Sequence, residues 1–165
     1  MKIRKAQIDD MKQISNIRPA IYKKMIASGL NQWDEKYPSD EILLDDINNS
    51  EMFVALIDDE IAGYITVNED IPDEYKTVDL KFDAKLCVHR LSINPKFSRQ
   101  GIGTKMMEYV HGHFKDMNYT AICLDTCEAN LAALRLYDKL GYITRGYVNF
   151  PRRPQYRFPV MEIML

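Results

Sequence analysis

The feature that most constrains the fold is the alternation of strand-like and helix-like segments between residues 86 and 148. Residues 86–93 (LCVHRLSI) form a strand-like run that Asn94-Pro95 ends. The spacing of apolar residues then predicts, in order, a helix over 101–117, a strand over 121–126, a helix over 130–140 and a strand over 142–148. Such alternation predicts a sheet that is covered by helices.

The first half of the chain adds a hairpin and two helices. Strand-like segments lie at residues 3–6, 52–57 and 61–67, and Asp58-Asp59-Glu60 predicts the turn between the last two. We expect one helix to begin at Asp9, to be kinked or split by Pro19 and to end at Ser28-Gly29, and a second to be capped by Ser39. Residues 158–165 form a last strand.

The predicted order is β-α-α-β-β-β-α-β-α-β-β. Hairpin strands come first and crossover helices later, which predicts an α+β fold of three layers, with a mixed, mostly antiparallel sheet flanked by helices. No repeat or Ser/Gly-rich linker divides the 165 residues, so we expect a single domain over residues 1–165.

Composition excludes several functions. A net charge of −2 argues against a general nucleic-acid binder, and the apolar runs are too short for a membrane span. The N-terminus lacks the apolar region of an export signal, and three cysteines cannot all pair, so we expect a reduced, cytoplasmic protein. Cys123 and Cys127 are four residues apart, but no further pair completes a zinc set, so no metal is expected.

A glycine-bracketed turn opens the helix at residue 101. The first N–H groups of a helix lack intrahelical partners, and glycine lets an anion approach the backbone, so Arg99, Gln100, Gly101, Ile102, Gly103 and Thr104 can hold a phosphate group. The order Gly103-Thr104-Lys105 excludes a P-loop, and Met106 stands where a dinucleotide fingerprint has its third glycine. An ordinary strand-to-helix turn is the alternative interpretation.

The next helix carries an asparagine and a tyrosine on one face. Asn130 and Tyr137 are seven residues apart and nearly eclipse, with Ala133 between them. Asn130 is also a good N-cap, and Tyr137 could simply pack in the core. In a functional interpretation, the Tyr137 hydroxyl donates to, or protonates, the thiolate that leaves when an amine attacks a thioester.

Together these segments resemble the GNAT superfamily of acyl-CoA-dependent N-acetyltransferases, from about Val88 to Val148. The family loop Gln/Arg-x-x-Gly-x-Gly/Ala is matched by residues 98–103, with Ser98 in place of Gln or Arg. The family pattern Asn-x-x-Ala-x-x-Leu-Tyr-x-x-Leu-Gly-Phe is matched over residues 130–142, with Tyr142 in place of Phe.

The resemblance implies a GNAT-like sheet and a role for each matched segment. The main chain of Leu91, Ser92 and Ile93 would pair with the pantetheine arm, and residues 99–104 would hold the pyrophosphate. Asn130 and Ala133 would lie near the thioester, and Tyr137 would be the general acid. The implied reaction moves an acetyl group from acetyl-CoA to a primary amine, of a small molecule or a protein N-terminus, by direct attack in a ternary complex. A homodimer is compatible with this fold.

The remaining roles stay open at this point. The general base could be His89, Glu69, Asp70 or a water chain. The acceptor groove would be lined by Trp33 and Tyr37, by residues 69–75 and by residues 149–157, whose arginines (Arg152, Arg153 and Arg157) could meet a carboxylate. A non-catalytic acyl-CoA-binding or regulatory module on the same fold is the alternative function.

Overall fold

The computed structural model describes residues 1–34 and 36–165, so Glu35 of the expected loop 29–39 lies outside the described residues. Its elements, in chain order, are β1 (Lys2–Lys5), η1 (Ile8–Asp10), α1 (Met11–Ala27), α2 (Asp40–Asn48), β2 (Met52–Ile57), β3 (Glu60–Asn68), η2 (Asp73–Thr77), β4 (Leu86–Ile93), η3 (Pro95–Phe97), α3 (Ile102–Asp116), β5 (Ala121–Asp125), α4 (Leu131–Lys139), β6 (Ile143–Val148) and β7 (Phe158–Met164).

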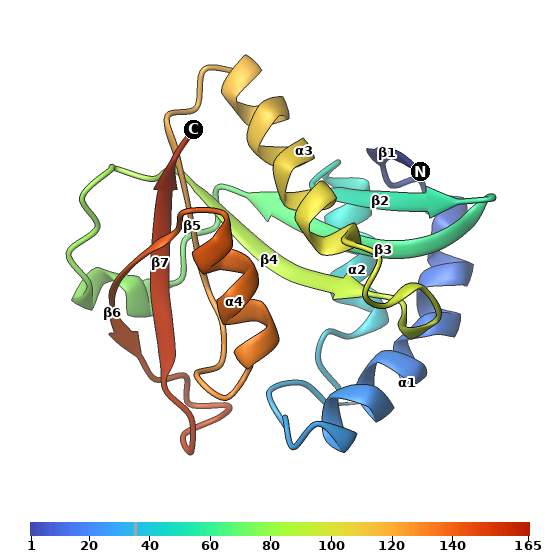
Figure 1. Ribbon diagram of the computed structural model, residues 1–165, viewed down its shortest axis with the longest axis horizontal. Helices are drawn as coiled ribbons and strands as arrows, with labels where there is room; N and C mark the ends of the chain where they lie inside the picture. The colour runs from blue at the N-terminus through green and yellow to red at the C-terminus, as the bar shows by residue number, and fades with distance from the viewer. Residues whose placement is uncertain (35) are drawn as a thin grey trace. The chain divides into compact units, whose positions relative to one another are not determined.

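The strands form one sheet in the order β1-β2-β3-β4-β5-β7-β6 (Figure 1). β4 pairs with β5 in parallel, and Leu86 lies opposite Ile122. The pairs β1–β2, β2–β3, β5–β7 and β6–β7 are antiparallel. The predicted α+β fold, with a mixed and mostly antiparallel sheet flanked by helices, is therefore confirmed.

Contacts divide the chain into two compact units. The first unit comprises residues 1–67 and 89–107, and the second comprises residues 68–88 and 108–165. β4 and α3 each contribute residues to both units.

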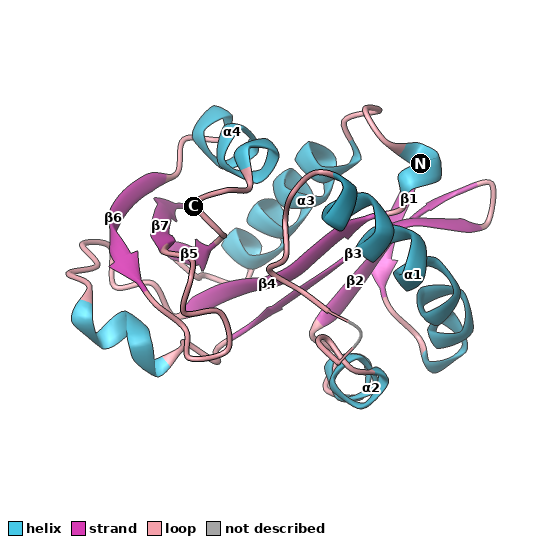
Figure 2. Cartoon of the chain, turned by 90° about the horizontal axis from the view of Figure 1, so that it is seen from below, coloured by secondary structure: helices cyan, strands magenta, loops and turns pink. Residues whose placement is uncertain are grey.

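The first unit has helices on both faces of its strands. Side chains of α1, α2, β2 and β3 share one buried core, which includes Ile14, Leu43, Val54 and Tyr64. On the other face of β3, Gly63 meets the start of α3, since a Cβ there would lie 3.1 Å from the Met106 sulfur. Figure 2 shows α2 and α3 on opposite sides of β2 and β3.

In the second unit, α4 covers one face of β5 and β7 (Figure 1). Its core includes the fully buried residues Val110, Ile122, Leu124 and Val160. α4 ends at Lys139, and Gly141 directly after the C-cap Leu140 has a φ of +89°, the left-handed conformation that glycine adopts readily after a helix. This ending is the one that the sequence predicts.

In the first unit, the turn between β2 and β3 and the cap of α2 form as the sequence predicts, whereas the start of α1 differs from the prediction. Asp58 and Asp59 both have positive φ, as a tight hairpin turn requires, and the Ser39 hydroxyl accepts the Ile42 N–H at the start of α2. The expected cap at Asp9 is wrong, because η1 precedes α1 and places Asp10 at the helix start, where its carboxylate binds Arg4. α1 runs unbroken through Pro19, so the expected split does not occur, and the alternative of a kink there stays a prediction.

Candidate functional site

A residue with positive φ precedes the main-chain segment that is predicted to bind the pantetheine arm. Arg90 in β4 has a φ of +54°, which is uncommon for a non-glycine residue inside a strand. Its guanidinium is held by Asp46 through two hydrogen bonds of 2.8 and 2.7 Å, and both side chains are almost fully buried. Leu91 and Ile93, which follow Arg90, are half-buried, and Ser92 is buried.

Neighbouring groups hold this part of β4 close to β3. The main-chain N–H of Asn94 donates to the carbonyl of Ala62 at 2.9 Å, and its side-chain amide donates to Ile61 at 3.0 Å. A Cβ at Gly63 would lie only 2.8 Å from the carbonyl oxygen of Ser92, so glycine is required for this close approach. The left-handed backbone at Arg90 and the contacts to β3 together fix the course of residues 91–93.

The predicted phosphate loop has the backbone of an anion-binding turn. Arg99 and Gly101 have φ of +62° and +72°, and α3 begins at Ile102. The first backbone hydrogen bond into the helix runs from Lys105 N–H to the Gly101 carbonyl at 3.1 Å. Among the described residues, no carbonyl accepts from the N–H groups of residues 99–104, so these donors are available to an anion.

The side chains of this loop leave space for a ligand. Arg99, Gln100 and Gly101 are exposed, whereas Ile102 is buried and anchors the start of α3 in the core. A Cβ at Gly101 would have no heavy atom within 4 Å, so glycine is required there by its φ and not by crowding. Gly103 and Thr104 are half-buried in the first turn of the helix.

In the second unit, Asn130 performs the capping role that its position allows. Its side-chain oxygen accepts the N–H of Ala133 at 3.2 Å, which fixes the start of α4. Ala133 is half-buried. The structure therefore assigns Asn130 a structural role, while contact with a cofactor stays a prediction.

Tyr137 lies on the same helix with its ring buried. It is 5% exposed and packs against Tyr142 at a ring-centroid distance of 5.6 Å. Burial raises the pKa of Tyr137 well above its usual value, and the charge of Asp125 raises this pKa further. The hydroxyl therefore stays protonated near neutral pH, and no group within the described residues is hydrogen-bonded to it.

A carboxylate that the sequence analysis did not select lies at the end of β5. Asp125 is half-buried, and one of its oxygens accepts a 2.6 Å hydrogen bond from the hydroxyl of Tyr75 in η2. Burial raises the pKa of Asp125 to about 6, against an opposing effect of the Tyr75 hydrogen bond. The buried thiol of Cys87 lies 3.9 Å from the same Tyr75 hydroxyl. In the sequence, Asp125 can be recognised only as a carboxylate at the end of a buried strand.

The predicted base candidates occupy different environments. Glu69 and Asp70 are exposed, and Glu69 accepts a hydrogen bond from the hydroxyl of Tyr119. His89 is half-buried in β4, within the first unit. Glu69 and Asp70 are thus more exposed than Asp125, and His89 belongs to the other unit.

A pocket of about 590 Å³ in the first unit contains part of the predicted acceptor groove. Trp33 lines it together with Tyr22 and Ile26 of α1, and the Trp33 ring contacts the ring of Tyr37. The buried Arg18 at its wall is paired with Asp40 and donates to the carbonyl of Pro38 at 2.6 Å. The pocket therefore combines apolar and aromatic side chains with charged ones, and of its two cations, Arg18 and Lys23, Arg18 is already paired.

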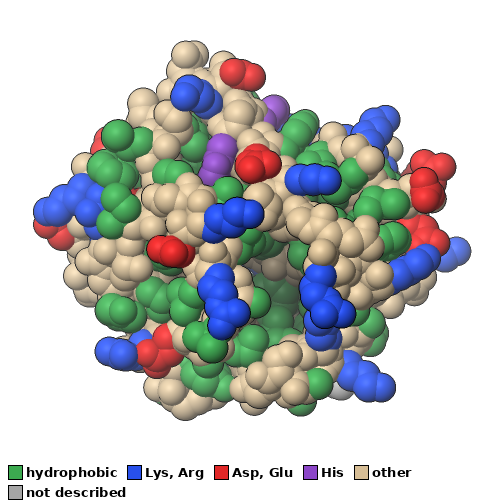
Figure 3. All heavy atoms as spheres, viewed as in Figure 1, with side chains coloured by type: hydrophobic (Ala, Val, Ile, Leu, Met, Phe, Trp, Pro, Cys, Tyr) green, Lys and Arg blue, Asp and Glu red, His purple; other side chains and the backbone are tan. Residues whose placement is uncertain are grey.

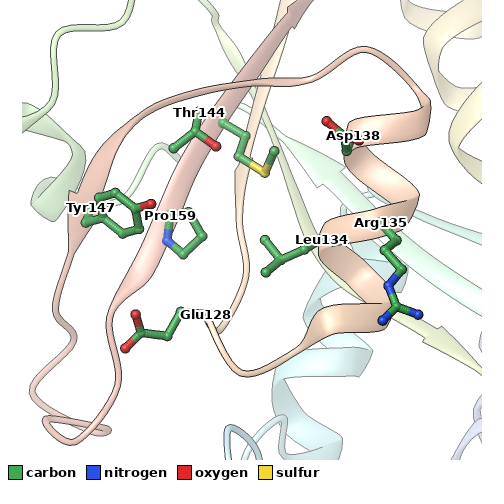
Figure 4. A pocket seen from close by; sticks show the side chains of 8 residues that line it. Glu128, Leu134, Arg135, Asp138, Thr144, Tyr147 and Pro159 are labelled. Carbon is green, nitrogen blue, oxygen red and sulfur yellow. The ribbon is translucent and has the colours of Figure 1, made fainter.

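In the arginine-rich connection before β7, Arg157 already interacts with other side chains of the protein. Arg157 pairs with Glu128 at 3.0 Å and covers the ring of Tyr147. Figure 4 shows the adjacent hollow of about 460 Å³ between α4, β6 and β7. Eight residues line it: Glu128, Leu134, Arg135, Asp138, Thr144, Tyr147, Pro159 and Met161. It holds no residue that the sequence selected for cofactor binding.

Within residues 1–34 and 36–165, no group of three or more His, Cys, Asp or Glu side chains could hold a metal ion. No helix in this part of the chain is long and apolar enough to cross a bilayer. Cys87, Cys123 and Cys127 are free, buried thiols.

Sequence relatives are acetyltransferases. "Probable N-acetyltransferase 14" of Xenopus tropicalis is 28% identical over 105 residues, which is 63% of this chain and 46% of that protein. The "Uncharacterized N-acetyltransferase YesJ" of Bacillus subtilis (strain 168) is 24% identical over 147 residues, 86% of this chain and 81% of that protein. The matched region thus spans less than half of the frog relative.

Solved structures have the same fold. The crystal structure of a GNAT family acetyltransferase from Streptococcus agalactiae 2603 has a TM-score of 0.86, with 22% identity, and covers 99% of this chain and 95% of its own. The PaiA N-acetyltransferase of Thermoplasma acidophilum, solved in complex with coenzyme A, has a TM-score of 0.76 at 18% identity, covering 99% and 98%.

The family itself is identified by its sequence model. The model of the Acetyltransferase (GNAT) family matches residues 16–142, which include β4, the loop before α3, and α4. This match covers most of the chain and both of the segments on which the sequence resemblance rested. The protein therefore belongs to the GNAT family of acetyltransferases.

Proposed function

We propose that this protein transfers an acetyl group from acetyl-CoA to a primary amine by direct attack within a ternary complex. The observation that carries this proposal is the turn at residues 99–104, in which six consecutive N–H groups lack a backbone acceptor among the described residues. Such a turn at a helix start suits a pyrophosphate. The main chain of Leu91, Ser92 and Ile93 would pair with the pantetheine arm, directly after the left-handed residue Arg90.

Tyr137 acts on the leaving group in this proposal. As the amine nitrogen attacks the thioester carbon, the carbon–sulfur bond breaks and its electron pair moves to sulfur. A free thiol titrates near 8.5, below the raised pKa of Tyr137, so complete proton transfer from the phenol is unfavourable. We therefore assign Tyr137 a hydrogen bond to the departing sulfur, which stabilises the developing negative charge.

Asp125 is our proposed acceptor for the proton that the amine loses. A carboxylate with a pKa of about 6 is ionised at neutral pH and is more basic than an ordinary carboxylate. The hydrogen bond from Tyr75 fixes the orientation of this carboxylate. Asp125 then releases this proton to solvent, and the departing thiolate takes up a proton from solvent, so the net reaction moves one proton from nitrogen to sulfur and yields an amide and free CoA.

The acceptor amine binds, in this proposal, at the pocket of about 590 Å³ beside Trp33 and Tyr22. Its aromatic and apolar walls suit an amine that carries an apolar body. We place this activity in the cytoplasm, because the free thiols of all three cysteines are consistent with a reducing compartment.

The test is a thiol-release screen with acetyl-CoA and amines of four classes: amino acids, polyamines, aminoglycosides and short peptides. We expect free CoA to appear only when an accepted amine is present, with an equal amount of acetylated amine by mass spectrometry. CoA binding without thiol release across the whole panel would instead support a non-catalytic acyl-CoA-binding module.

A further inference from the structure

Three basic side chains line one pocket beside the phosphate loop in the first unit. Lys23 and Lys24 project from α1, and Arg99 belongs to the loop itself. The pocket has a volume of about 730 Å³, and its other lining residues (Ala20, Ala27, Pro95 and Ser98) carry no charge. Figure 3 shows Lys and Arg side chains exposed over α1 and the loop before α3.

These cations are not neutralised by the protein. Among the described residues, neither lysine nor Arg99 forms an ion pair with a carboxylate, although Lys96 in the same region pairs with Glu60. The chain as a whole carries a net charge of −2, so three cations without an ion-pair partner in one pocket are a local excess of positive charge. Such a cluster attracts an anionic ligand.

A hydrogen bond holds the Lys24 side chain against the loop before α3. The Lys24 ammonium donates to the hydroxyl of Ser98, and that hydroxyl donates to the Pro95 carbonyl at 2.8 Å. Ser98 is also the position at which this chain lacks the Gln or Arg of the family pattern. The small hydroxyl leaves room at the loop, and α1 supplies the positive charge there through Lys24.

Coenzyme A carries two separate anionic groups on its nucleotide. The pyrophosphate is one, and the phosphate on the 3′-oxygen of the ribose is the other, one sugar ring away. Arg99 belongs both to the loop that we assign to the pyrophosphate and to the wall of the basic pocket, so the two sites are contiguous. A second phosphate of the same ligand can therefore reach the lysines.

We propose that Lys23, Lys24 and Arg99 bind the 3′-phosphate of coenzyme A, so that the protein distinguishes CoA from dephospho-CoA. This inference rests on the proposed function, because it needs the pyrophosphate to occupy the loop at residues 99–104. Phosphate oxygens accept charge-assisted hydrogen bonds from lysine and arginine, which are stronger than neutral ones.

The test is calorimetric titration of the full chain with CoA and with dephospho-CoA. We expect the wild-type protein to bind CoA about tenfold more tightly, since one charge-assisted contact is typically worth that factor. In Lys23→Ala/Lys24→Ala the affinity for CoA should fall about tenfold, while that for dephospho-CoA changes less than twofold. Lys12→Ala, an exposed lysine near the start of α1, is the control and should change neither affinity.

The single variant Lys23→Ala removes one positive charge without removing the contact to Ser98, because that contact is made by Lys24. It therefore distinguishes a loss of charge from a change in loop geometry. We expect a smaller loss for CoA and none for dephospho-CoA. Equal binding of the two ligands by the wild type would overturn the inference and leave the proposed function intact, as would equal losses for both ligands in the double variant. Failure to bind either ligand would overturn the inference and the proposed function together.

Discussion

The phosphate loop at residues 98–104 and the cluster of Tyr75, Asp125 and Tyr137 serve the proposed reaction in different ways. The loop works with backbone N–H groups, and it depends on the φ of Gly101 and on the start of α3. The cluster works with side chains whose burial raises the pKa values. Binding of the donor and movement of protons are therefore separable, and substitutions should affect one without the other.

The largest effect should come from Tyr137→Phe. Removing the hydroxyl deletes the hydrogen bond to the departing sulfur and keeps the ring that packs on Tyr142. We expect kcat to fall by about 10²–10³-fold, while the Kd for CoA changes less than about twofold. Steady-state thiol release and calorimetry measure the two quantities. Turnover at the wild-type rate would remove Tyr137 from the mechanism.

Asp125→Asn should have the next largest effect. The amide keeps an oxygen for the Tyr75 hydroxyl but cannot take a proton, so we expect kcat/KM to fall about 10²-fold at pH 7. In the wild type, kcat/KM should rise with pH through about 6, because the carboxylate becomes ionised there. This acid limb should be absent in the variant.

Stability separates this effect from damage to the fold. The pKa of Asp125 is raised in the folded state, so its contribution to stability is present at low pH and is lost as pH rises through about 6. A neutral Asn does not carry this cost, and Asp125→Asn should melt at or above the wild-type temperature at pH 7. An acid limb that persists unchanged in Asp125→Asn would return the role to His89, Glu69 or water.

The loop should respond in the opposite way. Gly101→Ala forces a Cβ into the left-handed region, at a cost of about 1–2 kcal/mol in stability, and should weaken CoA binding about tenfold. The effect on kcat at saturating acetyl-CoA should be less than about twofold, because only binding is lost.

Gly112→Ala is the matched control within α3. A Cβ there meets nothing within 4 Å, and the residue is helical, so the free energy of unfolding should rise by about 0.5–1 kcal/mol with CoA affinity unchanged. If both glycine variants weakened CoA binding equally, a general disturbance of α3 would explain the loss in place of the loop conformation.

The smallest effect on activity should come from a substitution at His111, whose role in the second unit is structural. Burial lowers the pKa of His111 to about 4, and its ring nitrogen lies 2.8 Å from the Tyr142 hydroxyl. The folded state therefore loses stability as pH falls from about 6.5 to 4, where the unfolded chain takes up a proton first. His111→Asn should reduce this loss of Tm between pH 7 and pH 5. An unchanged pH dependence would show that His111 does not contribute.

The sequence and the structure agree best where function depends on local backbone. The turn before α3, the cap at Asn130 and the end of α4 before Gly141 each leave a short signal, because glycine and capping residues act within one turn of a helix. Asp9 was misjudged because a 3₁₀ turn and the pair Arg4–Asp10 shift the helix start by one residue.

The proton-transfer cluster could not be predicted in the same way. Tyr75 and Asp125 are 50 residues apart in the chain and meet only through the fold of the second unit. Burial of Asp125 and the resulting pKa are tertiary properties that no spacing rule contains. The same holds for Lys24 and Ser98, which are 74 residues apart.

The most direct test of the central claim compares wild type and Tyr137→Phe with saturating acetyl-CoA and the best amine from the screen. The quantities to measure are the amounts of free CoA and acetylated amine in one reaction, beside the Kd for CoA. We predict equal amounts of both products from the wild type, a loss of at least about 10²-fold in the variant, and an unchanged Kd. Amine-dependent product formation at the same rate in both proteins, or a Kd for CoA that rises as much as the rate falls, would contradict the account.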